Sequence, residues 1–250
     1  MRLLLAALLL AAAPDKAADT PDLMQSLPEA GLPDGGAAYC GPVAVSNSLV
    51  WFTRHGYPTL AQREVDSPAG QGGLAALLGG PRYMRTTYTS GTSAHQILEG
   101  LERYMQDHGA PQARLSYQGT GAKIAPRFLA RAGAPDPAWI ARGLEGDGAV
   151  WLKLGWYTYN RQTDRYHIFA GHWVTVVGYD HQDPLRPIIH DPAPRSGPTL
   201  QHDHARLDLL QHGGQAMRGF YQVGGNLHLK SGADAGILDE AIVLRMDGRL

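Results

Sequence analysis

The chain has 250 residues, 44% of them hydrophobic, which is enough for one sizeable domain or two small ones. Its formal net charge is −1 and its lysines and arginines form no basic run, so nothing indicates a nucleic acid as partner. The 31 glycines and 17 prolines indicate many turns and long loops. We therefore expect a mixed α and β protein rather than a helical bundle.

The N-terminus has the pattern of an export signal. Met1 and Arg2 precede a stretch from residue 3 to residue 13 that contains only Leu and Ala. This stretch is too short to cross a membrane, but it has the length and the small-residue end of a signal peptide. We expect residues 1–18 to be a cleaved signal and the protein to be secreted or periplasmic, without stable membrane association. An uncleaved membrane anchor is the alternative.

The only cysteine, Cys40, stands at the predicted start of a helix. Pro42 suits the first helical turn and Gly56 follows the last, so the helix is expected from Cys40 or Gly41 to about residue 55. A sulfur in that turn lies at the positive end of the helix dipole, which favours the thiolate, and nearby N–H groups can donate to an oxyanion. A buried structural cysteine is the alternative. Because exported proteins usually carry cysteines in pairs, a lone cysteine suggests an intermolecular bridge or a free reactive thiol, which favours the catalytic interpretation over the structural one.

The rest of the chain changes from helices to strands. Within the poorly readable segment 57–147, Thr92 or Ser93 is a suitable N-cap for a helix that ends at Gly109, and Pro-Asp-Pro at 135–137 introduces a shorter one. From residue 149 on, apolar and β-branched residues predict strands at 150–154, 172–179, 188–189, 220–223 and 241–244. The sequence thus predicts an α+β fold in one domain, 19–250. Its helical part covers about 19–147 and its β part about 148–250, with the site between them.

Two polar residues of the β part complete a reactive group with Cys40. His172 begins one predicted strand and Asp191 ends the next, and antiparallel pairing of these strands would bring both residues to one edge of the sheet. In such a group the imidazole takes the thiol proton, the thiolate attacks a carbonyl carbon, and the imidazolium protonates the leaving amine. Asp191 would orient the imidazole and stabilise its charged form.

Three blocks around these residues resemble the C39-like branch of the papain-like cysteine peptidases. The blocks are Tyr-Cys-Gly-Pro at 39–42, Gly-His-Trp-Val-Thr-Val-Val-Gly-Tyr-Asp at 171–180 and Ile-Ile-His-Asp-Pro at 188–192. Cys40, His172 and Asp191 also occur in the order of that family's catalytic residues. The resemblance implies a papain-like two-lobe fold, in which a helical lobe carries the nucleophile and an antiparallel β lobe carries the histidine and the aspartate.

The sequence departs from the family pattern before the cysteine. Papain-like enzymes commonly carry a Gln about six residues upstream as an oxyanion donor, and Asp34 stands there instead. A carboxylate cannot donate a hydrogen bond unless it is protonated. We therefore consider Gln25, the nearest upstream Gln, as a side-chain donor beside the backbone N–H of Cys40. A solvated loop position for Gln25 is the alternative.

These observations predict an exported cysteine peptidase with Cys40 as nucleophile, His172 as general base and acid, and Asp191 as orienting carboxylate. It requires no cofactor, and its partner is a peptide or protein substrate. The same residues could instead transfer an acyl group to another amine or thiol, as in phytochelatin-synthase-like enzymes. A catalytically inactive binding domain of the papain-like family is the second alternative.

Histidines elsewhere raise the question of a metal. His202, His204 and His212 lie near Asp203, but no second group of ligands stands at a zinc-like spacing, so we expect a polar loop there and no metal. The chain also has no G-x-S-x-G elbow, P-loop or dinucleotide fingerprint, which argues against a serine hydrolase, a nucleotidase and a dehydrogenase.

Overall fold

The computed structural model describes residues 16–61, 64–193, 203–225, 227 and 229–248, so most of the expected signal lies outside the described residues. The helices are α1 (Cys40–Arg54), α2 (Pro68–Gly79), α3 (Ala94–Asp107) and α4 (Pro137–Leu144). The strands are β1 (Arg114–Gly119), β2 (Leu129–Ala132), β3 (Gly148–Asn160), β4 (Arg165–Tyr179), β5 (Pro187–His190), β6 (Asp203–Leu209), β7 (Tyr221–Gly225) and β8 (Ala235–Arg245). Short 3-10 helices lie at Pro28–Ala30, Pro33–Gly36, Pro58–Leu60, Pro126–Phe128, Asp180–Gln182 and Gly214–Met217.

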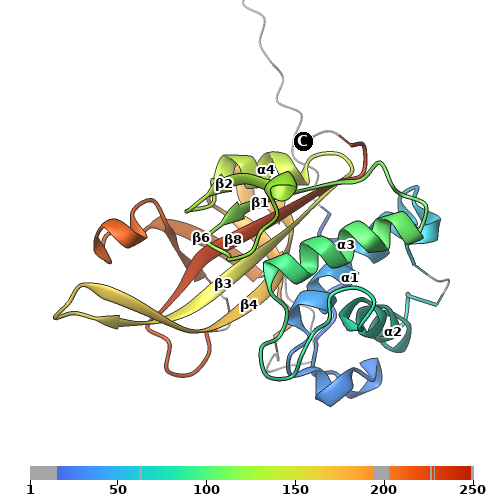
Figure 1. Ribbon diagram of the computed structural model, residues 1–250, viewed down its shortest axis with the longest axis horizontal. Helices are drawn as coiled ribbons and strands as arrows, with labels where there is room; N and C mark the ends of the chain where they lie inside the picture. The colour runs from blue at the N-terminus through green and yellow to red at the C-terminus, as the bar shows by residue number, and fades with distance from the viewer. Residues whose placement is uncertain (1–15, 62–63, 194–202, 226, 228, 249–250) are drawn as a thin grey trace, which may run out of the picture.

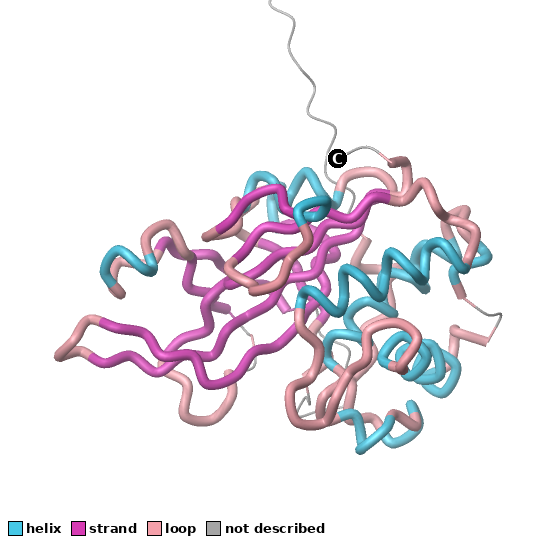
Figure 2. The backbone as a smooth tube through the Cα atoms, viewed as in Figure 1, coloured by secondary structure: helices cyan, strands magenta, loops and turns pink. Residues whose placement is uncertain are grey.

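Six of the strands close into an antiparallel barrel (Figures 1 and 2). Around the ring the order is β8-β3-β4-β5-β6-β7, and the ring closes where Gln222 of β7 pairs with Ile237 of β8. One edge of β8 pairs with β3 along its length, whereas the other pairs with β7 near its start and with β1 from Glu240 onward. β2 is the parallel neighbour of β1. Both β1 and β2 therefore lie outside the ring.

The expected papain-like two-lobe fold is wrong. The strands do not form a lobe that faces a helical lobe, because six of them close on themselves, and the part expected to be helical, 19–147, also contributes β1 and β2. Alternation of side chains along one strand is a local signal. Ring closure depends instead on the pairing of β8 with β3, such as Ile237 opposite Gly155, because the other neighbours in the ring are consecutive strands of the chain.

The barrel strands separate two apolar clusters. The interior cluster takes side chains from all six barrel strands and from α4: Ile140, Leu144, Val150, Leu152, Leu154, Val174, Val176, Ile189, Ala205, Leu207, Val223, Leu238, Ala241 and Val243. On the outside, Trp151 and Trp173 pack with buried residues of α1, α2 and α3. The indole N–H of Trp151 donates to the carbonyl of Ala44 at 3.1 Å, and that of Trp173 donates to the carbonyl of Thr92 at 2.8 Å. The first of these contacts holds α1 against β3, and the second holds the loop before α3 against β4.

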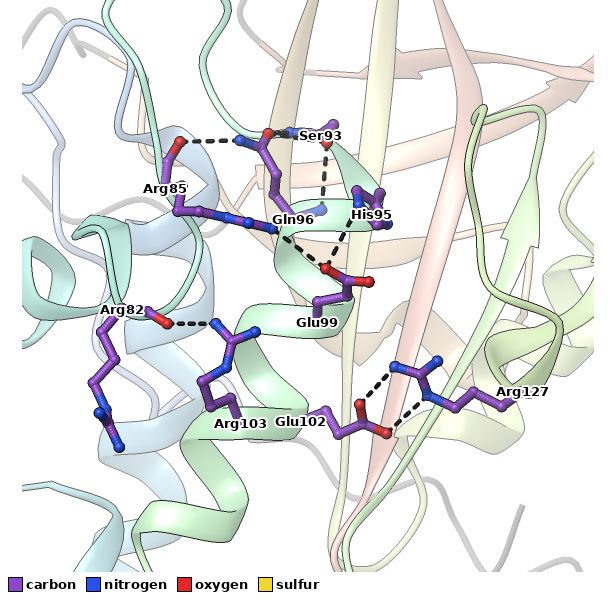
Figure 3. Close-up of polar contacts among 9 residues, drawn as sticks. All are labelled: Arg82, Arg85, Ser93, His95, Gln96, Glu99, Glu102, Arg103 and Arg127. Atoms are coloured by element: carbon purple, nitrogen blue, oxygen red, sulfur yellow. Dashed lines mark hydrogen bonds and ion pairs between the residues drawn. The ribbon is translucent and has the colours of Figure 1, made fainter.

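Three helices begin where the sequence places them. α1 begins at Cys40, α3 follows Ser93 and α4 begins at Pro137. The Ser93 hydroxyl oxygen accepts the N–H of Gln96, and the Gln96 side-chain oxygen accepts the N–H of Ser93, which is a capping box (Figure 3). Arg127 pairs with Glu102 at 2.7 Å and so ties the segment before β2 to α3 (Figure 3). Within the described residues, no helix is both long and apolar enough to cross a membrane.

Sequence patterns missed α2, β1, β2 and β6. The α2 sequence carries glycines at 70, 72 and 73, and glycine weakens a helical pattern because it loses the most backbone freedom on folding. Gly72 is nevertheless required, because a Cβ there would lie 1.9 Å from the carbonyl oxygen of Ala30. Close packing against the segment before α1 therefore overrides local propensity in α2.

The described chain begins with a lysine that is packed into the domain. The N–H of Lys16 donates to the carbonyl of Val177 at 2.7 Å. Its ammonium group donates to the carbonyls of Gly146 and Gly148 at 2.8 and 2.5 Å and lies 4.0 Å from the ring centroid of Trp51. Burial lowers the pKa of Lys16 to about 7. The end of the expected signal, from residue 16 to residue 18, thus overlaps the folded domain.

Candidate active site

Cys40 lies in the first turn of α1, beside β4, and is only partly buried. Its sulfur accepts hydrogen bonds from the backbone N–H groups of Gly41 and Trp173 and shares one with the imidazole of His172. Gly41 allows a close approach of the neighbouring loop, since a Cβ at this position would lie 3.1 Å from the Cβ of Thr92. The helix end is thus fixed against β4, where Cys40 as a whole residue is only partly buried.

His172 and Asp191 are brought together by the pairing of β4 with β5. Thr175 lies opposite His190 in this ladder. His172 lies three residues before Thr175 and Asp191 directly follows His190, so both lie at the same end of the ladder. Nε2 of His172 lies 2.5 Å from Oδ1 of Asp191, and the same oxygen accepts the N–H of Ala193 at 2.8 Å. The expected antiparallel pairing is confirmed. Both side chains are buried, and the carboxylate is fixed from two sides.

Trp156 of β3 stacks on the imidazole of His172. The ring centroids are 5.3 Å apart and the planes are inclined by 12°. Leu154 is the cross-strand partner of His172, and Trp156 lies two residues further along β3. Sequence reasoning missed this contact because it needs the β3–β4 register. Since Nε2 is occupied by Asp191, Nδ1 is the nitrogen left for the sulfur of Cys40.

The surroundings of the pair favour a thiolate and an imidazolium. Burial acts to raise the pKa of Cys40, but the hydrogen bond and charge of His172, with the N–H groups of Trp173 and Gly41, lower it overall. Burial acts to lower the pKa of His172, but the charge and hydrogen bond of Asp191, followed by the contact with Cys40, raise it to about 10. Both shifts favour the thiolate and imidazolium pair over the neutral thiol and imidazole.

Gln25 is buried at the start of α1 rather than solvated. Its backbone N–H donates to the carbonyl of Pro192 at 2.8 Å, which places it next to the loop of the orienting carboxylate. Its side-chain Nε2 donates to the carbonyl of Gly36 at 2.7 Å, and the same carbonyl accepts the N–H of Tyr39 at 3.0 Å. Among the described residues, Oε1 of Gln25 has no hydrogen-bond partner. The amide thus lies beside the residue that precedes the cysteine, with donor and acceptor capacity unused.

Asp34, which precedes the cysteine, and His190, which precedes the aspartate, have structural roles. Asp34, at the position of the family's usual Gln, is exposed and has a positive φ of 52° in a turn. His190 is buried and its Nδ1 donates to the carbonyl of Pro21 at 3.0 Å, away from the reactive group. It therefore anchors the segment before α1 to β5.

The histidine-rich stretch is partly a strand rather than a loop. Asp203 and His204 belong to β6, and Nδ1 of His204 lies 2.8 Å from a carboxylate oxygen of Asp180. His202 lies outside the described residues. In the part of the chain that the structure describes, no group of three or more His, Cys, Asp or Glu side chains is arranged to hold a metal ion.

Comparison of the chain with protein-family models, with curated proteins and with solved structures gave no match. A partly exposed thiolate, an imidazolium in contact with it and a carboxylate behind the imidazolium suit attack on a carbonyl carbon followed by protonation of the leaving group.

Proposed function

We propose that the protein is a cysteine peptidase that hydrolyses peptide or amide bonds. The observation that carries this proposal is the hydrogen-bonded series from the partly exposed Cys40 through the buried His172 to the buried Asp191. The sequence blocks around these three residues, in their order, resemble those of C39-like cysteine peptidases. The lowered pKa of the Cys40 thiol favours the thiolate, which is the nucleophilic form.

In the first half of the reaction, the Cys40 thiolate adds to the carbonyl carbon of the scissile bond, and the carbonyl electron pair moves to oxygen. When this intermediate collapses, the C–N bond breaks and Nδ1 of His172 gives its proton to the departing amine. A thioester with Cys40 remains. Water then attacks the thioester, His172 takes a proton from it, and the carboxylic acid leaves as the thiolate is restored.

The oxyanion of each intermediate requires hydrogen-bond donors. The N–H of Cys40 lies in the first helical turn, where an N–H has no partner within the helix. We assign the second donor to Gln25, whose Nε2 carries one N–H beyond the one given to Gly36. Loss of one such donor typically lowers kcat about 100-fold to 1000-fold. Gln25→Ala should show a loss of this order with KM little changed.

The test of the proposal is digestion of a proteome-derived peptide mixture by the mature protein, with Cys40→Ala as the matched variant and mass spectrometry as the readout. Wild type should generate new peptide termini that the variant does not. Thermal unfolding of the variant checks that it is folded at the assay temperature, so that lost cleavage reports on the missing thiol. Identical digests from the two proteins would refute the peptidase.

The same experiment separates hydrolysis from acyl transfer when glutathione is added as acceptor. Cleaved acids without ligated products support a hydrolase, whereas ligated products place the protein with the thiol acyltransferases. A binding domain without turnover would give neither product. In that case Cys40 would also react with iodoacetamide only near the ordinary thiol pKa of about 8.5.

We further propose that the peptidase is exported and that its signal is cut before Lys16. The first residues have the signal pattern, and a cut after residue 17 or 18 would remove the lysine that is held by Gly146 and Gly148. It would also place a charged residue, Asp15 or Lys16, three positions before the cut, where small residues are preferred. Intact-mass measurement of the secreted protein should give a mature chain that retains Lys16. A chain that begins at residue 18 or 19 would refute this assignment.

A further inference from the structure

Beyond the barrel, β3 and β4 continue as a projecting two-stranded ribbon (Figures 1 and 2). The next strand, β5, covers the outer edge of β4 only from Thr175 to Tyr179. Among the described residues, no backbone group pairs with the outer edge of residues 167–171. This segment, termed here the β4 edge, leads directly into His172. A free row of N–H and C=O groups therefore ends at the candidate active site.

The β4 edge contains a bulge with two exposed apolar side chains. Trp156 lies opposite Ala170 and Tyr157 lies opposite Ile168, which leaves Phe169 as the extra residue. Ile168 is 50% exposed and Phe169 is 46% exposed. Bulges re-aim side chains and are common next to active sites. An open edge that carries exposed apolar side chains is a template for pairing with another extended chain unless something covers it.

We propose that the β4 edge binds the substrate, an extended polypeptide segment, as an additional strand with an apolar side chain against Ile168 and Phe169. This inference rests on the proposed peptidase function and specifies its substrate class. Backbone pairing supplies affinity that does not depend on sequence, and the two apolar side chains add a preference. A strand rises about 3.3 Å per residue, so Phe169 lies about 10 Å from His172 along β4. A bound chain can thus reach the edge and the thiol together.

The continuity of the edge with His172 favours the substrate over other occupants. A folded partner would have to present a free strand, whereas an unfolded chain offers one everywhere along its length. A short substrate with one acyl residue reaches Cys40 without reaching the β4 edge. The two kinds of substrate should therefore respond differently to changes at residues 168 and 169.

The experiment compares wild type, the double variant Ile168→Ser/Phe169→Ser and the control Leu209→Ser. Leu209 is 51% exposed at the end of β6 and lies off the β4 edge. For reduced and carboxymethylated lysozyme, kcat/KM should fall about tenfold in the double variant, the scale expected for losing part of the burial of two large apolar side chains. For the p-nitrophenyl ester of N-acetylglycine, kcat/KM should not change, and Leu209→Ser should match wild type on both substrates.

A binding measurement tests the edge without turnover. Hydrogen exchange of the Cys40→Ala protein should show protection of backbone amides within 167–171 when reduced and carboxymethylated lysozyme is added, while amides of β3 at 148–154 should not change. Equal kcat/KM of wild type and double variant on the unfolded chain, or no protection of 167–171, would overturn the inference. Dimers in sedimentation experiments that dissociate in the double variant would also overturn it, in favour of a second copy. Failure of wild type to exceed Cys40→Ala on both substrates would instead reject the proposed function.

Discussion

Asp239 offers a direct test of the electrostatics on the barrel wall. Lys153 of β3 pairs with Glu240 and Leu154 pairs with Leu238, so Asp239 is the extra residue of a bulge. It is buried, and its Oδ1 accepts the hydroxyl hydrogen bond of Tyr157 at 2.7 Å. Burial raises the pKa of Asp239 from its usual 3.8 to about 6, against the opposing effects of Tyr157 and Lys153. Ionisation of the Asp239 carboxyl group therefore destabilises the folded protein.

The size of this effect follows from proton linkage. Between pH 3.8 and pH 6 the unfolded chain loses the Asp239 proton while the folded protein keeps it, so the stability of the folded state declines as pH rises through this window. A tenfold difference in proton affinity corresponds to about 1.4 kcal/mol, which makes the full destabilisation about 3 kcal/mol. Asp239→Asn removes the charge and keeps an oxygen that can accept from Tyr157. It should raise the free energy of unfolding by about 3 kcal/mol at pH 7.5 and by about 1 kcal/mol at pH 4.5.

Urea unfolding followed by tryptophan fluorescence measures this difference at both pH values. Asp208→Asn serves as control, because Asp208 is exposed in β6 and its loss should change stability by no more than about 0.5 kcal/mol. The reasoning fails if Asp239→Asn gains the same amount at both pH values, or if it destabilises the protein at pH 7.5.

Three further predictions concern α2, α3 and the reactive group. Gly72→Ala should lower the free energy of unfolding by about 3 kcal/mol, because its Cβ would lie 1.9 Å from the Ala30 carbonyl oxygen. A Cβ at Gly73 would meet nothing within 4 Å, so Gly73→Ala should raise the free energy of unfolding by about 1 kcal/mol in the same urea titration. A smaller loss, about 1 kcal/mol, is expected for Ser93→Ala, which removes the cap in Figure 3; an unchanged midpoint would contradict the cap. Asp191→Asn removes the charge that raises the pKa of the imidazole, so alkylation of the thiol by iodoacetamide at pH 6 should slow. A rate profile identical to wild type would exclude that electrostatic role.

Short stretches of sequence were sufficient to predict much of the candidate active site. A proline in the first turn marks where α1 begins and therefore where Cys40 lies. β4 and β5 are joined by a short connection, so their antiparallel pairing, and with it the approach of His172 to Asp191, follows from local order along the chain. Each of these signals involves neighbours in sequence or consecutive strands.

Other features depend on contacts between distant parts of the chain. Alternation along a strand tells which face is buried, but it does not tell which strand lies beside it, so the pairing of β8 with the distant β3, which completes the ring, was not predictable. The same holds for the stacking of Trp156 on the imidazole, which needs the β3–β4 register. Gln25 lies at the start of α1 only because the segment before that helix folds back. There Gln25 donates hydrogen bonds to the carbonyls of both Gly36 and Pro192. Local periodicity thus determined the nucleophile, its helix and the hairpin behind it, whereas barrel closure and the surroundings of the imidazole were decided by packing between segments far apart in sequence.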